Sequence, residues 1–362
     1  MSKKSLLLFF LLFSAFGFSQ TSFSPGFNKY EVRDALQFSA HFYSDSMRKT
    51  MNMPEIKNWE LVHSSEEVGL YNKWEFWHHP ENNTCAISIR GTVKHLSSWM
   101  EDFYSGMIKA EGQIQIDSTK TFNYKFAEDT TAFVHVGWTI GLGFMEEGIV
   151  SKIEEYYAKG VRNFYISGHS QGAALATLLT SYLHYHPTLP KDIQFKTYAL
   201  AAPKPGNLSY SYDFSSYTQD GWAFRIVNTL DWVPETPLTI QVIDDVSAIN
   251  PFVTIEESTK SMGKLERLVI LSVYGKMSKK LTKAQEYMTK YLGYKVHGFV
   301  EKDLPFVEQK EFEKSFEYSP CGTQYVLVPT SNDLAHFENP DDSFTHHHVW
   351  NYYFIFKKFL TD

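Results

Sequence analysis

Short apolar runs alternate with helical patterns between residues 83 and 230, and this alternation limits the choice of fold more than any other feature. The runs have the length of strands, and the patterns between them place apolar residues at helical spacing. Such alternation is typical of an α/β fold with a mainly parallel sheet, because each helix returns the chain for the next strand. The expected strands are 68–77, 83–89, 161–167, 195–200 and 224–228, and the expected helices are 139–157 and 171–184.

The composition is that of a folded protein. Hydrophobic residues make up 43% and charged residues 21% of 362, which is enough to bury a full core and excludes a disordered chain. The net charge of −7 lacks the basic excess of nucleic-acid-binding proteins. We therefore expect a globular protein with no nucleic-acid partner.

The N-terminus has the pattern of a secretory signal peptide. Lys3 and Lys4 precede an unbroken apolar run at 6–13, and a small-x-small cleavage site ends at Ser19. We expect residues 1–19 to be removed near Ser19, with the mature protein secreted or periplasmic; an N-terminal membrane anchor is the alternative. No other run has the length of a transmembrane helix, so no transmembrane span is expected. Residues 20–362 are expected to form a single domain.

The two cysteines, Cys85 and Cys321, leave open whether a disulfide forms. Neither has the spacing of a metal site, so no structural metal is expected.

Residues 168–172 read Gly-His-Ser-Gln-Gly and fit the G-x-S-x-G pattern of a nucleophile elbow. The segment lies between an expected strand and an expected helix, which is the context that this strained turn requires. Gly168 and Gly172 would allow neighbouring backbone to come close. Ser170 would lie at a helix N-terminus, where developing negative charge is favoured. The pattern predicts Ser170 as a nucleophile.

A serine needs a base to take its proton, and a histidine base needs a carboxylate on its other ring nitrogen. In α/β-hydrolases the chain order is serine, acid, histidine. Asp231 fits the acid, because it follows the expected strand 224–228 and precedes a Val-Pro turn. Asp244 and Asp245 are alternatives without a comparable strand before them.

The base is expected among His346, His347 and His348, which open the last apolar segment. Adjacent residues of a helix point about 100° apart, so the three side chains cannot all face one metal ion. We therefore expect one catalytic histidine here and no catalytic metal.

Residues 236–319 interrupt the alternating pattern and predict a largely helical insertion. Between Lys260 and Lys295 there are nine Lys and Arg residues and two Glu residues, in an otherwise acidic protein. The insertion is either a solvated decoration of the domain or a cap with an interfacial surface toward anionic substrates.

Six motifs in this order resemble those of the class 3 lipases, the fungal-lipase-like branch of the α/β-hydrolases. The resemblance spans roughly 83–234 and resumes at 320–353. The motifs are Arg90-Gly91-Thr92 with Trp99 and Asp102; His135-Val136-Gly137-Trp138; 168–172; the Ala-Pro turn at 201–207; Arg225, Asn228, Asp231, Val233 and Pro234; and Asn351-Tyr352.

The resemblance implies an α/β-hydrolase fold and assigns further residues. The family's histidine precedes the Asn-Tyr pair by four and five residues, which points to His347. The oxyanion hole would use Thr92 and the backbone N–H of Gln171, with Asp102 as support. By the same analogy, 94–103 is a lid candidate.

These observations predict a serine hydrolase of carboxylic esters that uses no cofactor. A lipase on acylglycerols is the first expectation, because the resemblance implies it; a phospholipase or a short-chain esterase is the alternative. A non-catalytic homologue that binds a lipid or a protein is an alternative of another class. The expected partners are the ester or lipid substrate and, through the insertion, a lipid surface.

Overall fold

The computed structural model describes residues 23–247, 249–336 and 341–360. The predicted signal peptide, 1–19, and its cleavage point near Ser19 lie outside these residues. In the described ranges, no helix combines the length and the apolar character needed to cross a bilayer.

A seven-stranded sheet forms the centre of the molecule, in the order β1-β2-β3-β8-β9-β10-β11. The strands from β3 onward are parallel, and β1 and β2 pair antiparallel at one edge. The mainly parallel sheet predicted from the sequence is therefore confirmed. The strands are β1 (Glu60–Ser64), β2 (Trp74–His79), β3 (Thr84–Ile89), β8 (Asn163–His169), β9 (Gln194–Leu200), β10 (Ala223–Asn228) and β11 (Thr323–Leu327).

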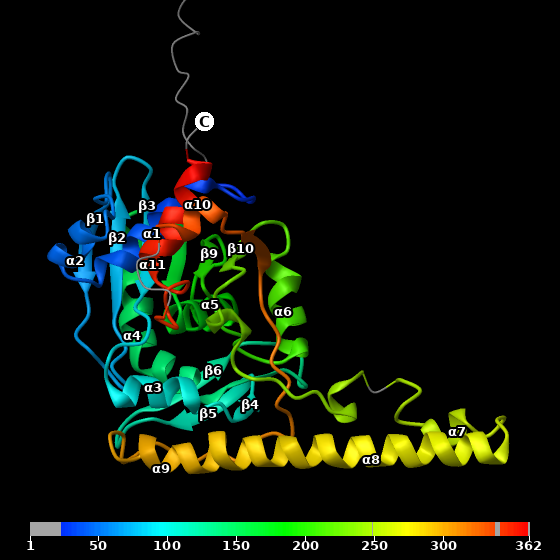
Figure 1. Ribbon diagram of the computed structural model, residues 1–362. Helices are drawn as coiled ribbons and strands as arrows, with labels where there is room; N and C mark the ends of the chain where they lie inside the picture. Colours follow the sequence, from blue (N-terminus) through cyan, green and yellow to red (C-terminus); the bar gives the residue numbers. More distant parts are fainter. Residues whose placement is uncertain (1–22, 248, 337–340, 361–362) are drawn as a thin grey trace, which may run out of the picture.

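Helices cover both faces of this sheet (Figure 1). On one face, α5 (Gln171–Tyr185) packs on β8 and β9, and α4 (Val136–Ala158) packs on α5. Small side chains in the first turns of α5 bring it close to the strands. On the other face lie α1 (Lys29–His41) and α11 (Val349–Phe356), which contact each other. Each helical layer has its own buried apolar cluster against the sheet, so the central strands are covered on both faces.

Shorter elements surround the sheet. They are α2 (Asp45–Thr50), α3 (Leu96–Phe103), α6 (Leu208–Thr218), α10 (Ser331–Leu334), and two small antiparallel sheets that pair β4 (Met107–Lys109) with β7 (Phe133–His135) and β5 (Glu111–Gln115) with β6 (Thr121–Lys125). Cys85 and Cys321 are both buried free thiols.

Two local expectations were wrong. The strand expected at 68–77 begins only at Trp74, because Tyr71 takes a positive φ of 69° in a turn before it. The three consecutive histidines do not lie within a helix: His346 and His347 lie in a turn, and His348 immediately precedes α11.

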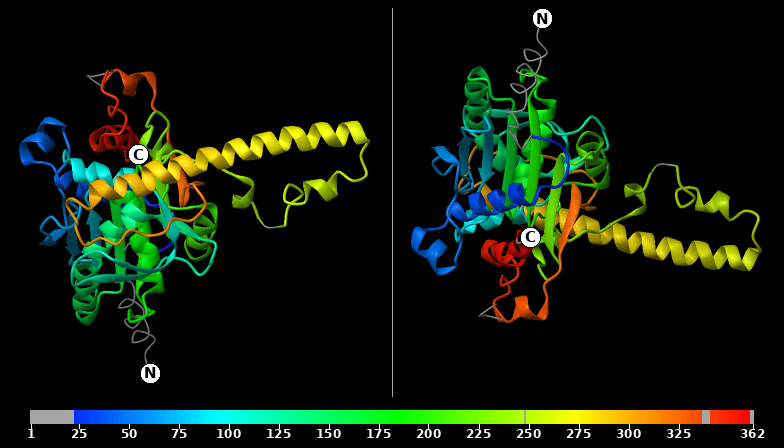
Figure 2. Two further views of the ribbon diagram at one scale, coloured as in Figure 1. Left: turned by 90° about the horizontal axis from the view of Figure 1, so that it is seen from below. Right: turned by 90° about the horizontal axis from the view of Figure 1, so that it is seen from above.

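The insertion at 236–319 is largely helical and departs from the body of the molecule. It contains α7 (Ile255–Ser258), α8 (Lys264–Met288), a π-helical stretch (Thr289–Lys295) and α9 (Val296–Val300). Figures 1 and 2 show α8 projecting well beyond the sheet and its helices, with the preceding loop extending beside it. We call residues 249–288 the arm. Past the arm the chain returns to the body, where α9 packs against α3.

Candidate active site

Ser170 lies at the sharp turn between β8 and α5. Its φ of 61° and ψ of −131° are unfavourable for a residue with a side chain. The flanking glycines allow this turn. A Cβ atom on Gly168 would lie 2.2 Å from the Gly172 carbonyl oxygen, and one on Gly172 would lie 2.2 Å from the Ile89 carbonyl oxygen. Both positions therefore require glycine, and Ser170 lies at the carboxyl ends of the parallel strands.

Asp231 lies in the loop after β10 and is almost fully buried. Its Oδ1 accepts a hydrogen bond from the Val233 N–H at 3.0 Å, and its Oδ2 accepts one from the Tyr352 hydroxyl at 2.8 Å. The buried Arg225 guanidinium holds the same loop, because it donates to the carbonyl oxygens of Pro234 and Ala202, each at 2.7 Å. The carboxylate is therefore fixed in position.

His347 joins the other two residues. Its Nε2 lies 2.8 Å from Ser170 Oγ, and its Nδ1 lies 2.8 Å from Asp231 Oδ2. A ring that donates from Nδ1 to the carboxylate can accept the serine proton at Nε2. The structure thus brings Ser170, His347 and Asp231 into one hydrogen-bonded line.

The rival candidates for acid and base lie in other contacts. His348 Nε2 is 3.0 Å from Asp342 Oδ2, and the backbone carbonyl of His346 accepts a hydrogen bond from Asn228. Asp245 caps a short turn through the Val242 N–H. In the described residues, only Asp231 among the candidate acids hydrogen-bonds to His347.

Asp102 connects both predicted oxyanion residues. Its carboxylate accepts hydrogen bonds from Thr92 Oγ1 at 2.8 Å, Gln171 Nε2 at 2.9 Å and Trp138 Nε1 at 3.0 Å. Burial raises the pKa of Asp102 to about 6, while the three donors and the nearby His347 oppose that rise. Gln171 is the first residue of α5, where a backbone N–H has no acceptor within the helix.

Three further residues contribute to the site in ways that were not predicted from the sequence. Tyr352 donates to Asp231, Trp138 donates to Asp102, and His169 packs beside His347 with ring centroids 4.7 Å apart. Burial holds the pKa of His169 well below its usual range, so this neighbour is uncharged. Tyr352 and Trp138 belong to the motifs that resemble class 3 lipases, and the presence of a phenol and an indole donor in those motifs was the available signal.

Aromatic side chains surround the His347 end of the site. Phe344 lies 6.0 Å from the His347 ring, 5.9 Å from Trp99 and 5.2 Å from Trp232, measured between ring centroids. Trp99 belongs to α3, whose Leu96 and Phe103 side chains are exposed. The site therefore has an apolar rim.

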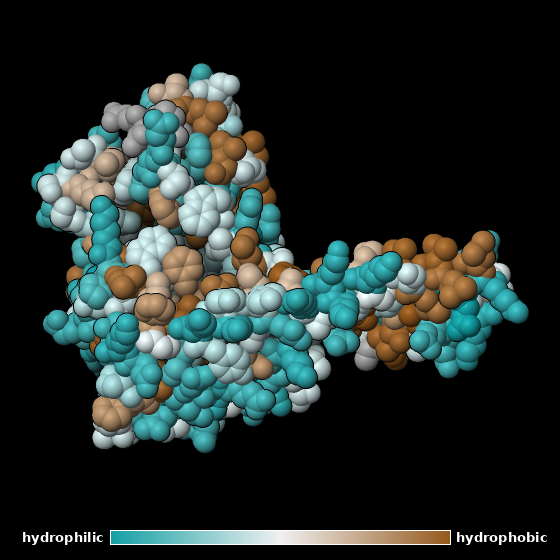
Figure 3. Space-filling model, turned by 60° about the horizontal axis from the view of Figure 1, so that its bottom comes forward, coloured by the Kyte–Doolittle hydropathy of each residue, from teal (hydrophilic) through white to brown (hydrophobic). Residues whose placement is uncertain are grey.

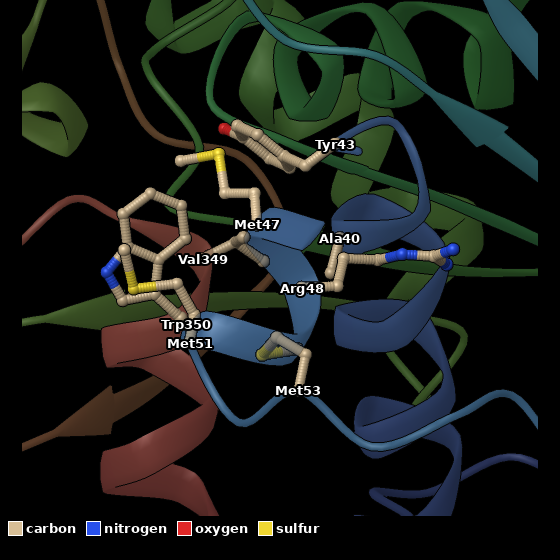
Figure 4. A pocket seen from close by; sticks show the side chains of 8 residues that line it. All are labelled: Ala40, Tyr43, Met47, Arg48, Met51, Met53, Val349 and Trp350. Atoms are coloured by element: carbon tan, nitrogen blue, oxygen red, sulfur yellow. The ribbon is translucent and has the colours of Figure 1, made fainter. Parts of the chain in front are cut away.

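A separate apolar depression lies between α1, α2 and α11 (Figure 4). None of its lining residues is among the predicted site residues. The lining comprises Ala40, Tyr43, Met47, Arg48, Met51, Met53, Val349 and Trp350.

A serine on a strand–helix elbow, a histidine within hydrogen-bond distance and a carboxylate behind it define a serine hydrolase on an α/β fold. Residues 86–241 match the family model described as Lipase (class 3), which is the family that the sequence motifs resemble. The chain is thus a serine ester hydrolase. No curated protein matches it.

Solved structures of fungal lipases are similar to this chain. A triacylglycerol lipase from Penicillium expansum is 21% identical, with 58% of this chain and 76% of that chain covered and a TM-score of 0.43. A mono- and diacylglycerol lipase from Aspergillus oryzae is 17% identical, with 59% of this chain and 76% of that chain covered and a TM-score of 0.44. The Rhizomucor miehei triacylglyceride lipase is 15% identical, with 59% of this chain and 77% of that chain covered and a TM-score of 0.42.

Proposed function

We propose that the chain is a secreted lipase that hydrolyses acylglycerols through Ser170, His347 and Asp231. The observation that carries the proposal is the line of two 2.8 Å hydrogen bonds joining these three side chains. Export is supported by the N-terminal sequence pattern, with its basic start, apolar run and small-residue cleavage site.

In the first half of the reaction, Ser170 Oγ attacks the ester carbonyl carbon while His347 Nε2 takes the hydroxyl proton. Asp231 holds the ring through Nδ1 and stabilises the imidazolium that forms. The tetrahedral intermediate collapses when His347 gives this proton to the departing alcohol oxygen. The products of this half are the free alcohol and an acyl ester on Ser170.

The second half reverses these roles with water. His347 accepts a proton from the attacking water, and a second tetrahedral intermediate forms. Its collapse breaks the bond to Ser170 Oγ, which receives the proton from His347, and releases the fatty acid. The backbone N–H groups of Thr92 and Gln171 are the proposed oxyanion donors in both halves. One such donor typically contributes about 3 kcal/mol of transition-state stabilisation. Asp102 supports both residues by accepting hydrogen bonds from their side chains.

The apolar rim favours a long acyl chain over acetate. Trp99 and Phe344 lie beside the base, and Leu96 and Phe103 extend the apolar surface along α3. This helix is the centre of the proposed lid, 94–103. A phospholipid carries the same acyl chains, so the head group decides between a lipase and a phospholipase.

A panel of esters from acetate to oleate, with one phospholipid of matched acyl chains, tests the proposal. We expect kcat/KM to rise toward the longer glycerol esters and to fall for the phospholipid. Fastest hydrolysis of acetate would indicate an esterase, and fastest hydrolysis of the phospholipid would indicate a phospholipase. A folded chain without turnover or burst release of p-nitrophenol would support the non-catalytic alternative.

A further inference from the structure

The outward side of α8 exposes a row of apolar side chains. The exposed fractions are 77% for Leu265, 67% for Leu268, 56% for Val269, 52% for Val273 and 58% for Met277. Spacings of three and four residues place them along one side of the helix. In the described chain, no other element covers this side.

The opposite side of α8 is already occupied by the loop of the arm. The Tyr274 hydroxyl donates to the Phe252 carbonyl oxygen at 2.9 Å, and Arg267 donates to the Glu256 carbonyl oxygen at 3.1 Å. The loop therefore contacts α8 on the side opposite the exposed row, and a small movement of the loop would not cover the row.

Apolar side chains of the loop enlarge the exposed surface near the far end of the arm. Figure 3 shows them with those of α8 as a continuous hydrophobic area on the projecting part. Monomeric soluble proteins rarely expose large apolar patches unless the patch binds something. The exposed loop residues are Ile249, Phe252, Val253 and Met262.

Four lysines lie on α8 around and beyond the end of the apolar row: Lys276, Lys279, Lys280 and Lys283. All four are exposed, and in the described ranges none of them forms an ion pair with a carboxylate. The arm thus combines an apolar outer part with a cationic inner part. Lysine stems can lie along an apolar surface while the ammonium groups reach outward to anions.

This charge pattern favours an anionic bilayer over a second copy of the chain as the partner. A second copy paired side by side in the same direction would place the four lysines against four lysines, which opposes association. A bilayer with anionic lipids offers apolar chains for the outer part and phosphate groups for the lysines at the same time. An apolar face flanked by lysines is typical of helices that lie in a membrane interface.

The base of the arm is connected to the site. The α8 helix continues through the π-helical stretch into α9, which packs beside α3 (Figure 1). The Ser97 hydroxyl hydrogen-bonds to Asp303, and the Tyr104 hydroxyl lies 2.9 Å from His297 Nδ1. A surface that binds the arm is therefore connected to the body through α9, which contacts the helix of the proposed lid.

We propose that the arm, residues 249–288, docks the protein on bilayers that contain anionic lipids. The apolar side chains of its outer part enter the interface, and the four lysines contact lipid phosphates. This surface lies outside residues 86–241, and docking requires no step of ester hydrolysis.

Vesicle co-sedimentation of the full chain with Ser170→Ala tests docking without hydrolysis. We expect binding to phosphatidylcholine vesicles that contain phosphatidylglycerol, weaker binding to phosphatidylcholine alone, and loss of the difference at high salt. Replacing the four arm lysines with Gln should weaken binding to the anionic vesicles at least about tenfold. Replacing Leu265, Leu268 and Val269 with Ala should weaken it as well, and alanine preserves the helix.

A matched control replaces four exposed lysines of the body, Lys49, Lys57, Lys109 and Lys191, with Gln. All variants carry the same N-terminus, so its apolar run contributes equally to each. Equal binding of the arm and body lysine variants would overturn the proposal. A dimer in sedimentation velocity that the three alanines abolish, without vesicle binding by the parent chain, would assign the surface to a second copy instead.

Discussion

The strand ends that carry the site and the projecting arm are built in opposite ways. At the site, Asp231 accepts three hydrogen bonds and Asp102 accepts three, and both are held by side chains from distant parts of the chain. In the arm, α8 exposes a row of apolar side chains and four lysines, and in the described ranges none of these lysines forms an ion pair. The polar groups of the first region are paired within the chain, whereas the second leaves an exposed surface that we propose binds a bilayer.

This contrast separates the residues proposed to hydrolyse esters from those proposed to bind the enzyme to a surface. The family model covers Ser170 and Asp231 but ends at residue 241, before the arm. The matched segment therefore contains the proposed nucleophile and acid, whereas the arm that we propose docks on a membrane lies outside it. Variants should separate the two: changes at the strand ends should affect turnover of every ester, and changes in the arm should affect only esters presented on a surface.

His347→Ala should cause a larger loss of turnover than a change at either neighbouring histidine or at the supporting acids. Without Nε2 there is no base for Ser170, and we expect kcat to fall by about 10⁴-fold or more. His346→Ala and His348→Ala should each stay within about tenfold of the parent, because His347 is the ring that bonds to both Ser170 and Asp231. Steady-state turnover of a p-nitrophenyl ester measures all three. If His346→Ala or His348→Ala abolished activity and His347→Ala did not, the histidine replaced in the inactive variant would be the base.

Asp231→Asn should lower kcat by about 10⁴-fold or slightly less, with folding retained. The amide can donate to His347 Nδ1 and so favours the tautomer that cannot accept the serine proton. Tyr352→Phe is a matched variant, because it removes one donor to the same carboxylate without changing the His347 partner. Its loss should be much smaller, and an Asn variant as active as the Phe variant would place the acid elsewhere.

Asp102→Asn should lower kcat about tenfold or more, because the hydrogen bonds to Thr92 and Gln171 change. It should also alter stability against pH. Burial raises the pKa of Asp102 from 3.8 to about 6, so the folded chain keeps this proton after the unfolded chain has lost it. Stability conferred by this group therefore falls as pH rises between about 4 and 6, by at most about 3 kcal/mol.

Urea unfolding of both proteins across that pH window measures the Asp102 effect. The free energy of unfolding of the parent, minus that of the Asn variant, should decrease from about pH 4 to about pH 6 and then level off. Parallel curves would mean that Asp102 titrates as an ordinary carboxyl.

Replacing the four arm lysines with Gln should have the smallest effect on chemistry. Turnover of a soluble short ester should stay within about twofold, because the triad is distant and unchanged. Hydrolysis of a glycerol ester in anionic vesicles should fall several-fold, and salt should reduce that difference. An equal loss on both substrates would show that the arm also shapes the site.

Much of the body could be predicted from the sequence, because strands and helices alternate and the elbow needs glycine on both sides of Ser170. Asp231 could be chosen because it follows a strand that ends at the same edge of the sheet as β8. The choice of His347 rested on the resemblance, since local pattern treats three adjacent histidines alike. Only tertiary contacts separate them.

The errors and omissions have physical causes. Residues 68–72 alternate like a strand, but the positive φ at Tyr71 turns the chain before β2 begins. The donors Tyr352 and Trp138 reach their acids from elements far apart in the sequence, which no local pattern reports. The direction of α8 could not be predicted either, because an amphipathic helix packs on a body or projects from it with the same periodicity.

Covalent labelling tests the central claim most directly. A p-nitrophenyl alkylphosphonate should release p-nitrophenol once per chain and leave its phosphonyl group on an activated serine. Peptide mass spectrometry should then find this group on Ser170 in the parent chain and nowhere in the Ser170→Ala variant, which should also lose ester hydrolysis by about 10⁴-fold or more. Labelling of another serine, or a folded Ser170→Ala variant that still hydrolyses esters, would contradict the assignment of Ser170 as the nucleophile.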